Sequence, residues 1–220
     1  MLQLGAVTVS YLEHDCFRIE AGGKVLYTDP FKIRDQRRRA DYVTVSHDHY
    51  DHLNGESLDR VLKPSTVIVA SESCRGKLDG KAKVVRYLKP GETYRDEGLS
   101  ITAVPAYNTN KFRSPGQAFH PRNYNGTGFI IELSGARLYH AGDTDLIKEM
   151  EGLGKIDLAF LPVSGTYVMT AEEAVEAAKK ISPAVAVPMH WGAIVGSRSD
   201  AEKFVAGVSA FGRAQLLDKE

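Results

Sequence analysis

The stretch Ser46-His47-Asp48-His49-Tyr50-Asp51-His52 directly follows the apolar run 42–45 and holds three histidines and two aspartates. A strand that leads into the stretch would place His47 and His49 at alternate positions, so that both imidazoles leave one face of the turning backbone. Neutral imidazole and carboxylate are ligands that zinc and other first-row cations accept, and a tetrahedral zinc ion needs about four. The pattern predicts a metal site rather than a polar loop that is histidine-rich by chance.

The spacing His47-x-His49-x-Asp51-His52 resembles the HxHxDH signature of the metallo-β-lactamase superfamily. The segment 140–144, His-Ala-Gly-Asp-Thr, resembles the superfamily's GD motif, and the segment 188–192, Pro-Met-His-Trp-Gly, resembles the one with its last histidine. These motifs span most of the chain. Within the superfamily the pattern looks most like compact metal-dependent hydrolases related to ascorbate-phosphate lactonases and to N-acylphosphatidylethanolamine phospholipase D.

The resemblance implies a fold, a cofactor and a ligand set. The fold is the four-layer αββα sandwich, an α/β (α+β) architecture with its site along one edge of two sheets. The cofactor is a pair of divalent metal ions, zinc in the first place, with manganese or iron as alternatives. The expected ligands are His47, His49 and His120 for the first ion, Asp51, His52 and His190 for the second, and Asp143 as a bridge between the two.

The third histidine of the first ion is where the sequence departs from the commonest superfamily pattern. In that pattern a histidine directly follows the strand before a long loop, and here Asn108 stands at about that place. His120, one strand before Asp143, is placed more as the third histidine usually is. We therefore expect His120 to bind the first ion. The alternative is that His120 lies at a loop tip and that His47 and His49 are the only protein ligands.

The resemblance also implies a reaction. Coordination to a metal ion lowers the pKa of water from about 15.7 to near 7, so a hydroxide between the ions would act as the nucleophile. Asp51 and Asp143 are thus catalytic as well as metal-binding candidates. Asp48 lies inside the motif but not at a ligand position of the family; it is a third catalytic candidate, and a solvent-exposed or turn-bonding aspartate explains it almost as well. The expected substrate is a small, anionic ester, lactone or phosphodiester.

The segment 105–126 has no apolar periodicity, and a loop of this length in a compact domain is usually functional or disordered. Its place between strands that flank the metal motifs favours function, so we expect the part from Asn108 to Tyr124 to form one wall of the active site. Any single cation in it is still best explained as a solvated side chain. The substrate-binding candidates in this segment are Asn108, Lys111, Arg113 and Arg122.

Two residues near the start of the chain have two interpretations each. His14, between the first two expected strands, is a further substrate-binding candidate, and a turn histidine bonded to its own backbone explains it equally well. Asp29, at the end of the third strand, either accepts the free N–H of a metal-bound histidine or caps the turn at Pro30.

Short apolar runs with turn residues between them predict two groups of strands, with helices between and after them. We expect one helix at 55–62 and a second from Ser71 to about Gly80. Thr170 and Glu173 form a capping-box pattern for a helix to about residue 181. The pair Ser199 and Glu202 repeats the pattern for a last helix to residue 211, and 215–217 is expected as an edge strand.

Length and composition agree with one soluble, cytoplasmic domain over residues 1–220, with 43% hydrophobic residues. Lys+Arg and Asp+Glu both number 28, so the zero formal charge gives no general attraction to nucleic acid or to an anionic membrane. Cys16 and Cys74 are far apart and outside any CxxC pair, so neither a disulfide framework nor a thiolate metal site is expected. No window approaches about 18 uninterrupted apolar residues, which argues against membrane insertion. A homo-oligomer is compatible with the sequence.

Two other classes of function compete with the hydrolase. A metal-stabilised binding or sensing domain would keep the cation without turnover, but a structural zinc normally has a closed coordination shell, whereas this ligand set implies a second ion and an open position. Redox chemistry with iron is disfavoured because members that resemble flavo-diiron proteins typically have Glu where this chain has His49. The sequence leaves the substrate, the native metal and the oligomeric state open.

Overall fold

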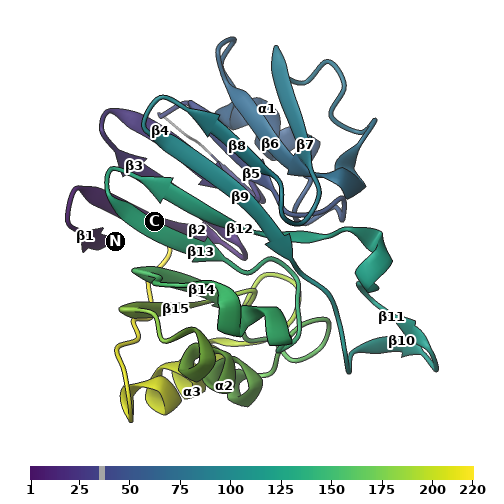
Figure 1. Ribbon diagram of the computed structural model, residues 1–220, viewed down its shortest axis with the longest axis vertical. Helices are drawn as coiled ribbons and strands as arrows, with labels where there is room; N and C mark the ends of the chain where they lie inside the picture. The colour runs from purple at the N-terminus through teal and green to yellow at the C-terminus, as the bar shows by residue number, and fades with distance from the viewer. Residues whose placement is uncertain (35–37) are drawn as a thin grey trace.

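The computed structural model describes residues 1–34 and 38–220, and its strands form two large sheets (Figure 1). Sheet A has the strand order β1-β2-β3-β4-β5-β6-β7, and sheet B has the order β15-β14-β13-β12-β9-β8. A small hairpin, β10-β11, projects from the lower right of Figure 1, apart from both sheets. The segment between β9 and β12 therefore leaves sheet B and returns to it.

Sheet A opens as an antiparallel meander and continues as parallel strands from β4 to β7. Gly22 and Gly23 both have positive φ angles and form the two-residue turn between β3 and β4, a conformation that glycine adopts without steric cost. The strands of sheet A are β1 (Leu2–Leu4), β2 (Val7–Glu13), β3 (Cys16–Ala21), β4 (Lys24–Thr28), β5 (Tyr42–Val45), β6 (Val67–Ser71) and β7 (Val84–Leu88).

Sheet B is antiparallel from β8 to β13 and parallel from β13 to β15. Its strands are β8 (Thr93–Asp96), β9 (Leu99–Pro105), β12 (Thr127–Leu133), β13 (Ala136–His140), β14 (Leu158–Pro162) and β15 (Val185–Met189). The separate hairpin consists of β10 (Phe112–Ser114) and β11 (Gln117–Ala118).

The helices cover the outer faces of the two sheets. In Figure 1, α1 (Gly55–Val61) lies beside β5 and β6, while α2 (Ala171–Ile181) and α3 (Arg198–Ser209) lie beside β14 and β15. Short 3₁₀ helices are η1 (Glu72–Cys74), η2 (Arg122–Tyr124) and η3 (Lys148–Gly152). Within the described residues, no helix is long and apolar enough to cross a membrane.

Two apolar cores hold these layers together. In the larger core, the inner faces of the two sheets meet, for example through Phe17 and Phe160 with ring centroids 4.1 Å apart, and α2 and α3 close its other side. The smaller core lies between α1 and the outer face of sheet A and includes Leu58, Val43 and Ile68. The expected αββα sandwich is confirmed.

Some of the local predictions were wrong. The helix from Ser71 to Gly80 is only the 3₁₀ helix η1, since the chain turns through positive φ angles at Gly76 and Gly80. The last helix, α3, is capped by Ser197 and Asp200 and not by the Ser199 pair. Residues 215–217 form no strand; only an isolated bridge joins residue 214 to β15.

The ends of several strands meet at one edge, and glycines make the close approach possible. β5, β13 and β15 all end there, because parallel strands present their carboxyl ends to the same side. Gly142 follows β13 with φ +61°, and a Cβ on it would lie 2.6 Å from the backbone oxygen of Thr127 and 3.3 Å from Ser46 Cβ. Only glycine therefore allows the segment after β13 to pass beside the segment after β5.

Candidate metal centre

The first group of donors consists of His47 and His49, which follow β5, and His120, which follows the β10-β11 hairpin. His49 Nδ1 lies 3.0 Å from His47 Nε2 and 3.1 Å from His120 Nε2. Two nitrogens that each bind one zinc ion at about 2.0–2.1 Å lie about 3.0–3.4 Å apart. The three nitrogens thus have the spacing of ligands to a single ion.

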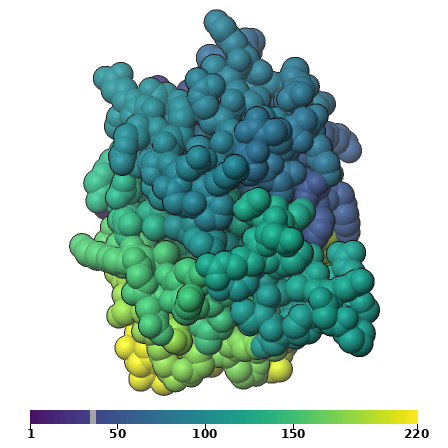
Figure 2. Space-filling view, turned by 45° about the vertical axis from the view of Figure 1, so that its right-hand side comes forward, coloured from purple at the N-terminus to yellow at the C-terminus, as the bar shows by residue number. Residues whose placement is uncertain are grey.

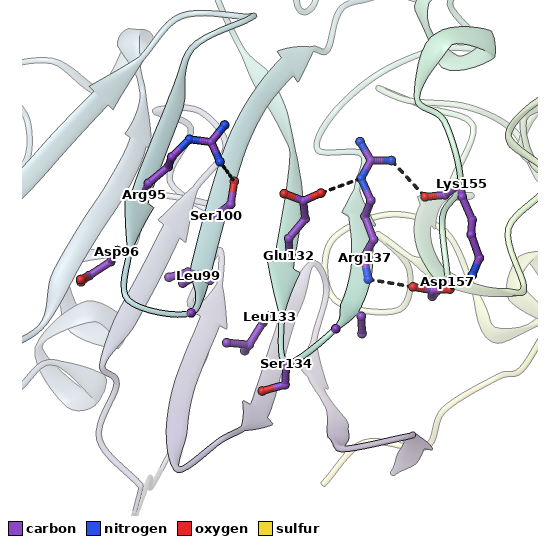
Figure 3. Close-up of a pocket in the computed structure, with 13 residues that line it drawn as sticks. Arg95, Asp96, Leu99, Ser100, Glu132, Leu133, Ser134, Arg137, Lys155 and Asp157 are labelled. Atoms are coloured by element: carbon purple, nitrogen blue, oxygen red, sulfur yellow. Dashed lines mark hydrogen bonds and ion pairs between the residues drawn. The ribbon is translucent and has the colours of Figure 1, made fainter.

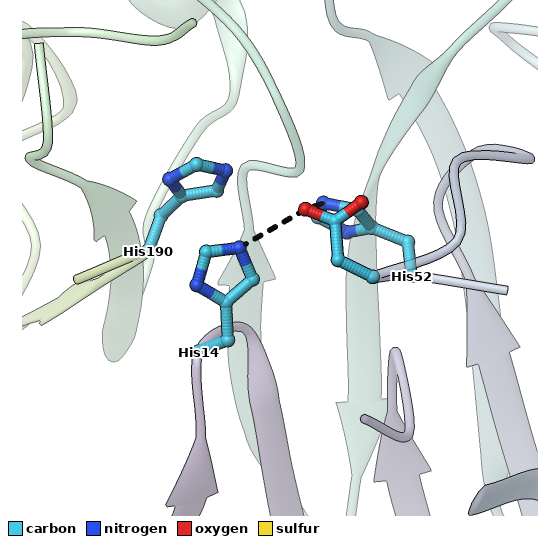
Figure 4. Close-up of side chains that lie close together, drawn as sticks. His14, His52 and His190 are labelled. Carbon is cyan, nitrogen blue, oxygen red and sulfur yellow. Dashed lines mark ion pairs between the residues drawn. The ribbon is translucent and has the colours of Figure 1, made fainter. Parts of the chain in front are cut away.

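The second group consists of His14, Asp51, His52 and His190, whose donor atoms all lie within 4.8 Å of one another. Figure 4 shows the three imidazoles approaching from separate segments of the chain. Asp51 Oδ2 is 3.3 Å from His14 Nε2 and 3.7 Å from His52 Nε2. Three of these residues are the ligands expected for the second ion, and His14 is an addition.

Asp143 lies between the two groups. Its Oδ2 is 3.3 Å from His190 Nε2, 3.4 Å from His120 Nε2 and 3.9 Å from His47 Nε2, and its Oδ1 is 3.3 Å from His52 Nε2. One carboxylate therefore approaches donors of both groups, which is the position that a bridging ligand requires.

Four of the imidazoles are oriented through Nδ1, so that Nε2 faces the centre. The Nδ1 contacts are His47 to Ser46 Oγ at 3.0 Å, His52 to Asp29 Oδ2 at 2.8 Å, His120 to Asn108 Oδ1 at 3.0 Å and His190 to Ser164 Oγ at 2.9 Å. Contacts of this kind fix the ring orientation and the tautomer of metal-binding histidines. Asp29 contacts His52 as the first of its two interpretations expects, and it also accepts from the backbone N–H of Ser46 at 2.7 Å.

Several buried polar atoms of the centre have no hydrogen-bond partner among the described residues. They are both ring nitrogens of His14, both carboxylate oxygens of Asp15, Nε2 of His52, Nε2 of His190 and Oδ1 of Asp143. Buried polar atoms are normally paired, because an unpaired one loses its hydration without compensation. Nitrogen and carboxylate donors left free in this way fit divalent cations such as zinc.

The two groups differ in their protonation. Burial lowers the pKa of His47 and His49, and it lowers the pKa of His120 to about 4, so this group is neutral at pH 7. In the second group burial acts in the same direction, but the Asp143 carboxylate outweighs it and raises the pKa of His190 to about 9. It also contributes to a pKa of His52 well above the usual value. A cation would bind the first group without displacing a proton, whereas binding to the second group would require His52 and His190 to lose theirs.

A cavity of about 420 Å³ opens onto the centre. It is lined by His49, Tyr50, Asp51, Arg113, Phe119, His120, Asp143, Tyr167 and Ile194. Part of this lining comes from the segment 105–126, which is teal and lies toward the right of the molecule in Figure 2. That segment contributes both an aromatic wall and a cation to the cavity.

The structure does not bring three other candidates to this cavity. Lys111 Nζ is 2.6 Å from Glu173 Oε2 of α2, and Arg122 forms an ion pair with Glu149 at 2.7 Å. Asn108 is buried; its Oδ1 accepts from the backbone N–H of His120 at 2.8 Å, and its amide donates to the carbonyl of residue 167. These side chains are already paired with other residues, and none of them lines the cavity.

Asp48 also lies away from the donor atoms. Its carboxylate is bound by Lys77 Nζ and by the hydroxyl of Tyr124, and it belongs to neither donor group. The catalytic role expected of Asp48 gains no support, because both its oxygens are engaged by these contacts.

A larger cavity, of about 580 Å³, lies at the other end of sheet B, near the β8-β9 and β12-β13 turns. Figure 3 shows Arg137 there between Glu132 and Asp157. The guanidinium is 3.1 Å from Glu132, and the backbone N–H of Arg137 donates to Asp157 at 2.9 Å. This cavity contains neither donor group, so its greater volume does not make it the reactive site.

Two residues of the centre carry no recognisable signal in the sequence. Asp15 is fully buried with Oδ2 3.5 Å from His52 Nδ1, and the only hint of its place is that it neighbours His14. Ser164, which orients His190, lies 26 residues before it and belongs to no motif. Their roles arise from contacts between distant segments.

Known proteins are similar to this chain in both sequence and fold. A family model for the β-lactamase superfamily domain matches residues 8–190. A UPF0173 metal-dependent hydrolase from Thermoplasma acidophilum is 31% identical, over 93% of this chain and 92% of that protein. A second one, from Pelotomaculum thermopropionicum, is 30% identical, over 94% of each chain.

Solved structures show the same relationship at the level of the fold. A Parabacteroides distasonis protein described as a metal-dependent hydrolase has a TM-score of 0.85 at 30% identity, over 97% of this chain and 94% of that chain. Igni18, a metallo hydrolase from Ignicoccus hospitalis, has a TM-score of 0.77 at 25% identity, over 96% and 95% of the two chains. The chain therefore belongs to the metallo-β-lactamase superfamily, among its metal-dependent hydrolases.

Proposed function

We propose that this protein uses two divalent cations, zinc in the first place, to hydrolyse an ester, lactone or phosphodiester bond of a small anionic substrate. The proposed ligands are His47, His49 and His120 for the first ion, Asp51, His52 and His190 for the second, and Asp143 for both. The observation that carries the proposal is the position of Asp143, whose carboxylate lies within 3.4 Å of imidazole nitrogens from both groups.

Two bound divalent cations would supply a nucleophile from water at neutral pH and would stabilise the negative charge that develops on the substrate. The residues of this chain hold the donors in place. Asp29 and Asn108 each keep one imidazole turned towards the centre. Phe119 and Tyr167, with ring centroids 4.8 Å apart, form an apolar wall beside the donors and exclude water from that side of the substrate.

Arg113 supports an anionic substrate. It lines the cavity together with the donors His49 and His120, and its guanidinium lies 5.5 Å from the centroid of the Phe119 ring. Unlike Lys111 and Arg122, it forms no ion pair with any residue that the structure describes. A carboxylate or phosphate of the substrate would supply the missing partner.

Replacing Arg113 with alanine is therefore expected to raise KM for an anionic substrate about 10- to 100-fold with a smaller effect on kcat. This corresponds to the roughly 1.5–3 kcal/mol of a hydrogen bond to a charged group. Steady-state kinetics of Arg113→Ala measure the effect, with Arg122→Ala as the matched control because its guanidinium already pairs with Glu149. An equal rise of KM in both variants would contradict a specific role for Arg113.

Elemental analysis and turnover together test the proposed function. The dialysed protein is expected to hold two ions per chain, and turnover of phosphodiesters, lactones and thioesters is expected to rise with metal loading. A stoichiometry of one ion would overturn the dinuclear centre. Two ions without turnover of any substrate would instead favour a binding or sensing domain.

A further inference from the structure

His14 lies in the turn between β2 and β3 and is held there by two contacts from other segments. Its backbone has φ +54°, a left-handed conformation that few residues other than glycine adopt. The backbone N–H of His190 donates to the carbonyl oxygen of His14 at 3.1 Å, and His140 Nε2 contacts the carbonyl oxygen of Asp15 at 2.9 Å. The turn is therefore fixed against the ends of β13 and β15.

Among the described residues, the only polar contact of the His14 side chain is with Asp51, itself a proposed ligand of the second ion. The ring of His14 is 0% exposed; among the described residues Nδ1 has no polar partner, and Nε2 meets only the Asp51 carboxylate, without good hydrogen-bond geometry. Burying an imidazole in this way is costly, and a left-handed backbone adds to the cost. The ring nevertheless lies 4.0 Å from the ring of His190, with Nε2 3.3 Å from Asp51 Oδ2. A further binding partner for the ring nitrogens of His14 would account for both the burial of the ring and the left-handed backbone.

We infer that His14 is a ligand of the second metal ion, beside Asp51, His52 and His190. The inference rests on the proposed function for the presence of that ion. It is carried by the convergence of these four donors within 4.8 Å and by the buried ring of His14, whose nitrogens make no hydrogen bond of good geometry among the described residues. His14 does not line the cavity, so it is no longer a substrate-binding candidate.

This assignment gives the two ions different roles. With Asp143, the second ion would have five protein donors and the first ion four, so the second is the more saturated of the two. The first ion has three histidines and Asp143. Two of those histidines, His49 and His120, line the cavity, whereas none of the three imidazoles of the second group does. The first ion is therefore the less saturated one and the one whose histidines face the substrate.

Direct detection of metal–nitrogen bonds tests the inference without any substitution. The whole protein, labelled with ¹⁵N-histidine and loaded with ¹¹³Cd²⁺, is expected to show ¹¹³Cd–¹⁵N coupling at six of its seven histidines, the exception being His140. Coupling at His47, His49, His52, His120 and His190 without His14 would overturn the inference. If only one ion binds, the dinuclear proposal fails, and coupling of that ion to His14, His52 and His190 would still support this assignment.

A variant gives an independent measurement. In His14→Asn the amide tolerates the left-handed backbone but is too short to reach the ion. Zn²⁺ affinity at the second site is expected to fall by more than the roughly 100-fold upper range for residues that only orient a ligand. Affinity at the first site should stay within about twofold of the wild type, as should both sites in the control Asp48→Asn. A loss below about 100-fold would mean that His14 only orients Asp51 and would overturn the inference.

Discussion

Replacing Asp143 with asparagine is expected to lower kcat/KM by at least about 10³-fold and to leave the protein with fewer than two tightly bound ions. The carboxylate lies within 3.4 Å of His120, His190 and His52, so one substitution weakens both sites. The amide keeps the shape of the side chain but removes its charge. Metal-ion catalysis contributes several kcal/mol, and losing about 4 kcal/mol of it corresponds to the stated fall in rate.

Metal analysis and steady-state kinetics of Asp143→Asn measure this effect. Asp48→Asn is the matched control, since it makes the same chemical change within the histidine-rich stretch at a carboxylate held by Lys77 and Tyr124. An Asp143→Asn protein that keeps two ions and activity within about tenfold of the wild type would show that the carboxylate does not bridge the sites.

Binding of the second ion is expected to tighten by at least about 100-fold between pH 7 and pH 9, with His52 adding to the effect of His190, while binding of the first ion changes little. The Asp143 carboxylate overcomes the effect of burial and raises the pKa of His190 to about 9, so below pH 9 a cation must displace its proton. Each displaced proton weakens binding about tenfold per pH unit below that pKa. Burial lowers the pKa of His120 to about 4, so no proton needs to leave it in this range.

Calorimetric titrations in buffers of different ionisation enthalpy count the protons released by each ion, with a chelator setting the free metal concentration. At pH 7 the second ion is expected to bind more weakly than the first, and only its affinity is expected to depend on pH. Equal slopes for the two ions would show that the two donor groups do not differ in protonation. The His190→Asn variant serves as a control, because the slope that its imidazole causes should then disappear.

The sequence by itself determined the superfamily, the fold and most of the proposed donor set. This was possible because the proposed ligands stand in short motifs at strand ends, where local spacing already restricts which side chains can meet. The histidine-rich stretch after β5 and the aspartate after β13 needed only the order of the strands to be placed at one edge. The capping box of Thr170 and Glu173 is equally local, and the structure contains it with contacts of 2.8 and 3.2 Å.

Only the tertiary structure decided which polar side chains are free and which are paired. Lys111 and Arg113 are two residues apart in one segment, yet the first meets Glu173, 62 residues later, and the second faces the cavity. The sequence likewise leaves His14 as an isolated turn residue, and the packing of the β2-β3 turn against β13 and β15 brings it to the donors. The energy of a charged or polar group depends on its nearest partners and its burial, and both are set by contacts between segments distant in the chain.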